Sequence, residues 1–279
     1  MDSSNVLGGI VALLSAAVWG SGDFVGGMAS RNRNQFQALA LVAFAGMLTL
    51  LIGMVVRSEV WPDPISLLWS VAAGVSGAIG MAALYQGLAT SQAALVAPTA
   101  AVVSVVFPVV IGTLLHGAPS LEKWLGMVAG MAGIWLVTKS LGSTRDTHVL
   151  GLAILAGFGF GGFFLCIVQT DPRSIFSPLV IEKMSACFFA ILILVLRRTR
   201  LPSLRGNGLA LLAGALDAGG NALYLLAARL TRPELAVVIS SMAPVMTVIL
   251  AAVVSKQKIS VYQKLGVGIC LIAIILILV

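Results

Sequence analysis

Three polar residues share one face of a segment that is otherwise apolar. Asp217, Asn221 and Tyr224 stand four and then three residues apart within residues 208–228. In an α-helix this spacing brings side chains onto one stripe. A carboxylate, an amide and a phenol on one stripe suit a wet cavity that holds an amino or hydroxyl group. The alternative is a hydrogen-bond cluster between helices that only orients this segment.

Trp19 and Asp23 form a second pair at helical spacing, in the first apolar segment of the chain. An aromatic ring one turn from a carboxylate can hold an ammonium group through cation–π attraction and charge together. The alternative is that Asp23 lies near the end of its segment and is hydrated there. We therefore expect Trp19 and Asp23 to line the same cavity as Asp217.

Glu182 and Lys183 are the other charged residues that stand inside an apolar segment. Neighbouring residues on a helix point about 100° apart, so we expect these two side chains to face different directions. One of them can point into the cavity while the other pairs with a different helix or reaches the headgroups, and a structural or interfacial role is the alternative. Together with Asp23 and Asp217 they give three acids and one base inside apolar segments. This imbalance favours a cation or a zwitterion with an amino group over a simple anion.

Motifs for catalysis are missing from the sequence. It contains no G-x-x-x-x-G-K-[ST] loop and no nucleophile elbow. His116 and His148 have no acidic or cysteine neighbours at the spacing of metal ligands, and they are better interpreted as interfacial histidines. We expect no enzymatic activity, no cofactor and no metal.

The composition is that of a membrane protein. Of the 279 residues, 59% are apolar and 10% are charged, and the mean hydropathy is +1.06. Soluble domains have about 25% charged residues, so a soluble, disordered or nucleic-acid-binding domain is excluded. Apolar runs of about 20 residues predict membrane-spanning helices, and no β-barrel alternation interrupts them. The ten expected spans are 6–27, 36–56, 66–88, 93–115, 121–138, 149–169, 178–196, 208–228, 234–254 and 261–279.

The two halves of the chain repeat each other. Ala83-Leu84-Tyr85 matches Ala222-Leu223-Tyr224, and Phe107-Pro108-Val109 parallels Ala243-Pro244-Val245, with the order kept along the chain. The match makes Tyr85 a further candidate for the cavity wall, and the prolines can bend their helices. We predict an all-α polytopic protein of two five-helix repeats, residues 1–140 and 141–279. Because five is odd, the second repeat is inverted, and such repeats enclose a central cavity near the membrane midplane.

The sequence resembles the drug/metabolite transporter superfamily, specifically its ten-helix EamA-type branch. The resemblance rests on Trp19-Gly20-Ser21 in the first span, on the doubled five-helix unit and on the prolines of spans four and nine. It implies alternating-access transport of small organic solutes, which with the acid excess predicts amino acids, amines or related metabolites, moved outward. Efflux of hydrophobic cations or drugs is a second possibility, and a non-transporting or lipid-handling membrane protein is a third.

The chain departs from that family at two connections. Many members have Gly-Glu after spans four and nine, whereas the stretches 116–120 and 255–260 of this sequence contain no acid. The role of that glutamate therefore cannot be transferred to this chain.

The side of the membrane that holds the termini is left open by the sequence. If both termini are cytoplasmic, the cytoplasmic connections carry five basic residues and the opposite ones eleven, which favours both termini outside. The family resemblance implies both termini inside. We expect a multi-pass protein of the inner or plasma membrane, monomeric or homodimeric, whose partners are a small-molecule substrate and lipids but not nucleic acid. We expect spans one, three, six, eight and nine to line its cavity.

Overall fold

A computed structural model describes residues 3–30, 35–88, 93–138, 147–254, 256 and 258–278, and within these ranges every regular element is an α-helix. This confirms the predicted all-α class. The first half of the chain folds into α1 (Ser3–Ser30), α2 (Gln35–Val56), α3 (Pro64–Leu88), α4 (Ala93–His116) and α5 (Leu121–Thr138). The second half folds into α6 (Thr147–Ile167), α7 (Phe176–Leu196), α8 (Gly208–Leu230), α9 (Pro233–Ser240), α10 (Ala243–Val253) and α11 (Val261–Leu278).

Nine segments among the described residues are long and apolar enough to cross a membrane, and α9 with α10 counts as one of them. The tenth expected span is α5, whose first turn contains Glu122 and Lys123 and which packs along α11. Large apolar side chains such as Ile52, Val55 and Val56 are exposed, as expected of a surface that faces lipid. The described residues therefore form a bundle of ten helical segments, nine of which are long and apolar enough to cross a membrane.

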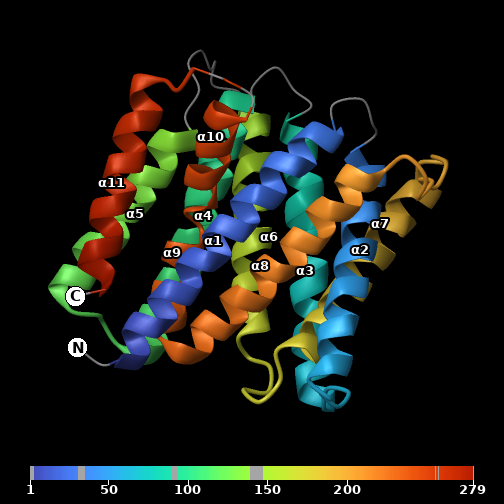
Figure 1. Ribbon diagram of the computed structural model, residues 1–279, viewed down its shortest axis with the longest axis horizontal. Helices are drawn as coiled ribbons and strands as arrows, with labels where there is room; N and C mark the ends of the chain where they lie inside the picture. The colour runs from blue at the N-terminus through green and yellow to red at the C-terminus, as the bar shows by residue number, and fades with distance from the viewer. Residues whose placement is uncertain are drawn as a thin grey trace.

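The second repeat runs opposite to the first. The first helix begins and the last helix ends on one side of the bundle (Figure 1), which we call the terminal side. Helices α1, α3 and α5 run away from this side, and their counterparts α6, α8 and α11 run back towards it. The packing has the same symmetry, because α1 packs along α8 as α6 packs along α3, and α2 packs against α7. The predicted inverted repeats are thus confirmed.

Small residues let the helix backbones approach closely. A Cβ on Gly159 of α6 would collide with Gly80 of α3, and the hydroxyl of Ser76 donates a hydrogen bond to the Gly159 carbonyl at 2.9 Å. Such contacts matter in lipid, where apolar side chains gain little from association with each other. The pair Gly126 and Gly130 of α5, four residues apart, likewise faces α11 and the α9 segment, so it lets these helices pack closely.

The ninth span is broken in the middle of the bundle. Helix α9 ends at Ser240 and α10 begins at Ala243, with Pro244 in its first turn. Proline has no N–H to continue the preceding helix and is tolerated in a first turn. The prediction of a bend is confirmed at Pro244, whereas α4 continues without interruption through Pro108. The α9 residues 234–240 are all buried, so the break lies inside the protein.

Candidate functional site

A central cavity of about 380 Å³ lies between the two repeats. Its walls include Leu39 near the start of α2, Leu84 near the end of α3 and Thr138 at the end of α5. All three belong to the half of the bundle away from the terminal side, so the cavity extends from the middle of the protein towards the opposite side. Most of its wall is apolar, with Val42, Met81 and other aliphatic or aromatic side chains.

An ion pair lies at the deep end of this cavity. Lys183 Nζ on α7 is 2.6 Å from Asp217 Oδ2 on α8 and 3.4 Å from Glu182 Oε2. The side chains of Lys183 and Glu182 are 9% and 5% exposed, whereas that of Asp217 is 34% exposed. A buried charge is stable only when it is paired. Lys183 is therefore the common partner of two carboxylates, and Asp217 is the one that a solute can reach.

Trp19 connects α1 to the same part of α8. Its indole Nε1–H donates to the Asn221 Oδ1 at 2.9 Å and lies 3.1 Å from the Asp217 carbonyl oxygen. Its ring stacks on Tyr224 at a centroid distance of 5.9 Å. The ring fits because residue 220 is glycine, since a Cβ there would collide with the indole. Residues of α8 thus hold the indole in two ways, by the hydrogen bonds of its N–H and by the stacking of its ring on Tyr224.

Asp23 is exposed and lines the cavity one helical turn beyond Trp19. It is close enough to Asp217 for the two carboxylates to repel each other. Two acids from different repeats that line one cavity would both be stabilised by a cation bound close to them. This arrangement provides the acidic part of the site.

The structure brings four of the six predicted site residues to one cavity. Trp19, Asp23, Asp217 and Asn221 line it together. Tyr224 does not line it: its side chain is buried behind Trp19 and lines a second, smaller cavity. Asp217, Asn221 and Tyr224 do lie along one face of α8, but this face extends from the central cavity to the smaller one. The side chain of Tyr85 lies outside the part of the structure that is described.

The expectation that the Glu182 and Lys183 side chains face different directions was wrong. Both side chains are buried and line the central cavity, and they contact each other. The long Lys183 side chain bends towards α8, past Gly46 of α2, where a Cβ would lie 3.4 Å from its Cδ and Cε atoms. The cavity also receives residues of α2, α4, α5 and α7, which the expected set of five lining spans omitted. A lysine within an apolar run was the signal available in the sequence.

The donor set does not indicate a metal. Among the residues that the structure describes, no group of three or more His, Cys, Asp or Glu side chains could hold an ion. The cavity residues instead combine one lysine, three acids and an indole. Such a set can bind an ammonium group by charge and cation–π attraction, and a carboxylate through Lys183.

The comparisons with known proteins identify the same architecture. The model of the EamA-like transporter family matches twice, at residues 6–139 and 147–279. Among solved structures, 29 chains match. One of them, titled "Crystal structure of protein", has a TM-score of 0.80 at 14% identity and covers 96% of this chain and 97% of that chain. Such a low identity shows the fold alone. No curated protein sequence matches this chain.

Proposed function

The chain belongs to the EamA-like transporter family and is a membrane transporter of small solutes, and from that premise we propose that its solutes are small amino-bearing molecules. Amino acids, amines and related metabolites make up this class. The observation that carries the proposal is the polar part of the central cavity, which Trp19 and Asp23 line together with the Lys183–Asp217 ion pair. Three acids and one lysine in the cavity make an amino group the preferred charged group.

A zwitterion fits this cluster at two points. Its ammonium group would lie between the Asp23 and Asp217 carboxylates, with the face of the Trp19 ring as its aromatic partner. Its carboxylate would accept a hydrogen bond from the Lys183 ammonium and would partly replace Asp217 as its partner. Lys183 can donate three hydrogen bonds. The apolar wall of α2 and α3 would hold the rest of the solute. In an alternating-access cycle the two repeats would then move around the bound solute.

Efflux of hydrophobic cations is the second candidate function. It is favoured by the largely apolar wall and by the acid excess, and it does not need Lys183. Family membership favours either kind of transport over a non-transporting or lipid-handling role. The two candidates differ in what they predict for Lys183, because only a solute with a carboxylate needs its ammonium group.

Thermal unfolding of the purified protein with a panel of ligands discriminates between these functions. The panel contains amino acids, primary amines and quaternary ammonium compounds. A ligand present at a concentration of 100 times its Kd stabilises the folded protein by about 2.7 kcal/mol, so a binder raises the melting temperature measurably. Stabilisation by amino acids supports the proposal. Stabilisation by bulky quaternary cations alone supports drug efflux, and shifts with lipids alone contradict both.

Transport by the Asp217→Asn variant tests the site itself. We expect uptake of the stabilising ligand into proteoliposomes to fall at least tenfold, because the variant loses the carboxylate that the cavity exposes. Glu122→Gln is the matched control, since this acid is exposed on the first turn of α5. Equal rates in Asp217→Asn and the parent protein would remove Asp217 from the mechanism.

We propose net export across the inner or plasma membrane as the direction of transport, an expectation of the family resemblance. Preloaded right-side-out and inverted vesicles test it, because export predicts faster solute release from the former. Faster release from inverted vesicles would reverse the direction.

A further inference from the structure

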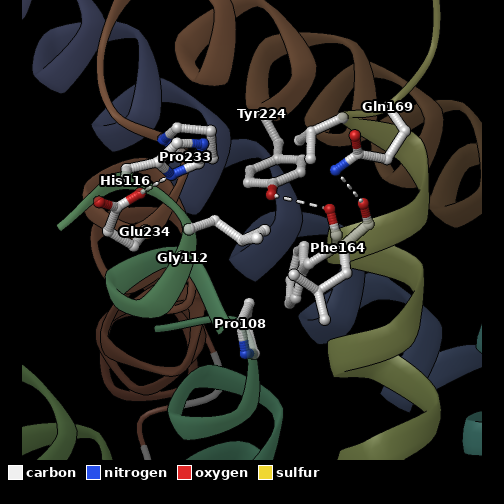
Figure 2. Close-up of a pocket in the computed structure, with 11 residues that line it drawn as sticks. Pro108, Gly112, His116, Phe164, Gln169, Tyr224, Pro233 and Glu234 are labelled. Carbon is white, nitrogen blue, oxygen red and sulfur yellow. Dashed lines mark hydrogen bonds and ion pairs between the residues drawn. The ribbon is translucent and has the colours of Figure 1, made fainter. Parts of the chain in front are cut away.

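A second cavity, of about 130 Å³, lies on the terminal side of the bundle (Figure 2). It is placed between the end of α4, the end of α6 and the start of α9. His116 and Gln169 are exposed at its outer end, and Tyr224 and Phe164 lie at its inner end. It therefore enters the protein from the side opposite to the mouth of the central cavity.

Phe164 separates the two cavities, and it lines both of them. Its ring is 4.8 Å from the Tyr224 ring and 5.8 Å from the Trp19 ring, and the Tyr224 hydroxyl is 3.4 Å from the Phe164 carbonyl oxygen. Figure 2 shows Phe164 and Tyr224 close together at the cavity wall. The barrier at this point is thus one layer of aromatic side chains.

The inverted repeats relate the two cavities to each other. Pro244 of α10 lines the central cavity, and its repeat counterpart Pro108 of α4 lines the smaller one. A pair of equivalent positions on opposite sides of the barrier is what an inverted duplication produces. The smaller cavity therefore shares a repeat-related wall position with the central cavity.

The wall of the smaller cavity contains one buried carboxylate, that of Glu234. Glu234 has a fully buried side chain; Arg232 pairs with its Oε1 atom, whereas Oε2 lacks a hydrogen bond within the described residues and lies 3.6 Å from His116 Nδ1. Gly112 makes room for this carboxylate, since a Cβ there would lie 3.1 Å from Oε2. A buried acceptor without a donor attracts a cationic donor. The cavity accordingly suits the same class of solute as the central one.

We propose that the smaller cavity is a second binding station for the amino-bearing solute and that the Phe164 ring is the partition between the two stations. The inference rests on the proposed function for the identity of the solute, but the partition does not depend on it. The solute passes Phe164 when the ring turns away from Tyr224, and the Oε2 atom of Glu234, which accepts no hydrogen bond within the described residues, then accepts one from the ammonium group.

Cysteine labelling tests the partition without any solute. The native cysteines Cys166, Cys187 and Cys270 are replaced by alanine, and Gln169→Cys places a reporter in the smaller cavity. A cleavable C-terminal tag identifies the terminal side of proteoliposomes. The protein with these substitutions and with Phe164 intact is the parent. The membrane-impermeant cation MTSET, applied from the side opposite to the terminal side, should not label its reporter cysteine. In Phe164→Ala we expect labelling at least ten times faster than in the parent.

Phe158→Ala is the matched control, because Phe158 is on the same helix, packs against Phe107 and is exposed. An unchanged rate in Phe164→Ala, with the reporter still labelled from the terminal side, would overturn the partition. So would labelling of the parent itself from the opposite side. If Phe164→Ala does not fold, Phe164→Leu replaces it under the same criteria.

The charge preference of the smaller cavity tests the binding station. Each labelling rate is divided by the rate at which the same reagent reacts with a free thiol in solution. From the terminal side, this relative rate should be several times higher for cationic MTSET than for anionic MTSES. Glu234→Gln should abolish this preference, and Glu122→Gln should leave it unchanged. Equal relative rates in the parent, or a preference that survives Glu234→Gln, would contradict a station for ammonium groups. Neither result depends on the ligand panel, so the two proposals fail separately.

Discussion

The deep end of the central cavity and the rim of the terminal side are both held by polar contacts, but they join different parts of the protein. At the cavity, the Lys183–Asp217 pair joins α7 and α8, two helices of the same repeat. At the rim, the Glu59 carboxylate of the first repeat accepts the backbone N–H groups of Ile175, Phe176 and Ser177, at the start of α7 in the second repeat.

Other contacts of the rim also cross between the repeats. Arg232 donates to the Gly117 carbonyl at 2.6 Å, and the Thr231 hydroxyl donates to Asn5 Oδ1 at 3.0 Å. If the repeats move relative to each other, the Lys183–Asp217 pair can stay intact while the rim contacts break. The comparison indicates that the Lys183–Asp217 pair moves as a unit with the second repeat, and that the rim determines which side is closed.

Removing Lys183 should have the largest effect. Lys183→Met leaves Asp217 and Glu182 without their counter-charge, and loss of one partner of a buried pair costs about 3–5 kcal/mol. We expect a value near the lower end of that range, because Asp217 is still hydrated by the cavity. Thermal or denaturant unfolding in detergent measures it. The double variant Lys183→Met, Asp217→Asn should regain part of the lost stability, and a further loss would contradict the pairing.

The contact between Trp19 and α8 should be sensitive to one methyl group. Gly220→Ala places a Cβ against the Trp19 indole, whereas Gly219→Ala meets only Val18 Cγ1 at 3.5 Å, an ordinary contact. Overpacking costs about 1–3 kcal/mol, so Gly220→Ala should lower the melting temperature by several degrees and weaken ligand stabilisation. Gly219→Ala should be close to neutral. Similar melting temperatures for the two variants would argue against the tight indole contact.

Weakening the rim should change accessibility more than stability. Glu59→Gln removes a negative charge from the N-terminus of α7. The helix dipole and the backbone N–H groups stabilise this charge, so its loss should lower the free energy of unfolding by about 1 kcal/mol. We expect faster MTSET labelling, from the terminal side, of a Ser241→Cys reporter that lines the central cavity in the cysteine-free protein, because the closed rim opens more often. Glu122→Gln again serves as the control. Slower or equal labelling would show that Glu59 does not hold this side closed.

The smallest effect should be at Asp63, which caps α3 at the terminal side. The Ser66 side chain and then the backbone N–H groups of Ser66 and Ile65 lower the pKa of this carboxyl group below 3.8. A lowered pKa in the folded state stabilises the protein above the unfolded pKa, and this contribution is lost as the pH falls through the folded pKa. Asp63→Asn keeps a capping side chain, so its deficit in melting temperature should be small at pH 7 and vanish in acid. A deficit independent of pH would contradict the carboxylate's role.

The sequence by itself determined the spans, the duplication and the positions of residues along each helix. Continuous apolar runs predict membrane crossings because the bilayer thickness sets their length. Helical periodicity placed Asp217 with Asn221 and Trp19 with Asp23, since side chains four residues apart share a face whatever surrounds them. An odd number of spans in each repeat was enough to predict inversion.

Only the tertiary structure decided which faces meet. In a soluble helix the apolar stripe marks the inner face, but in a membrane span lipid and protein interior are both apolar, and the sequence of a span does not distinguish them. Lys183 could therefore not be assigned to Asp217, nor Tyr224 to a second cavity, nor Phe164 to the layer between them. These assignments depend on the close approach of helices from both repeats, which contacts distant in the sequence determine.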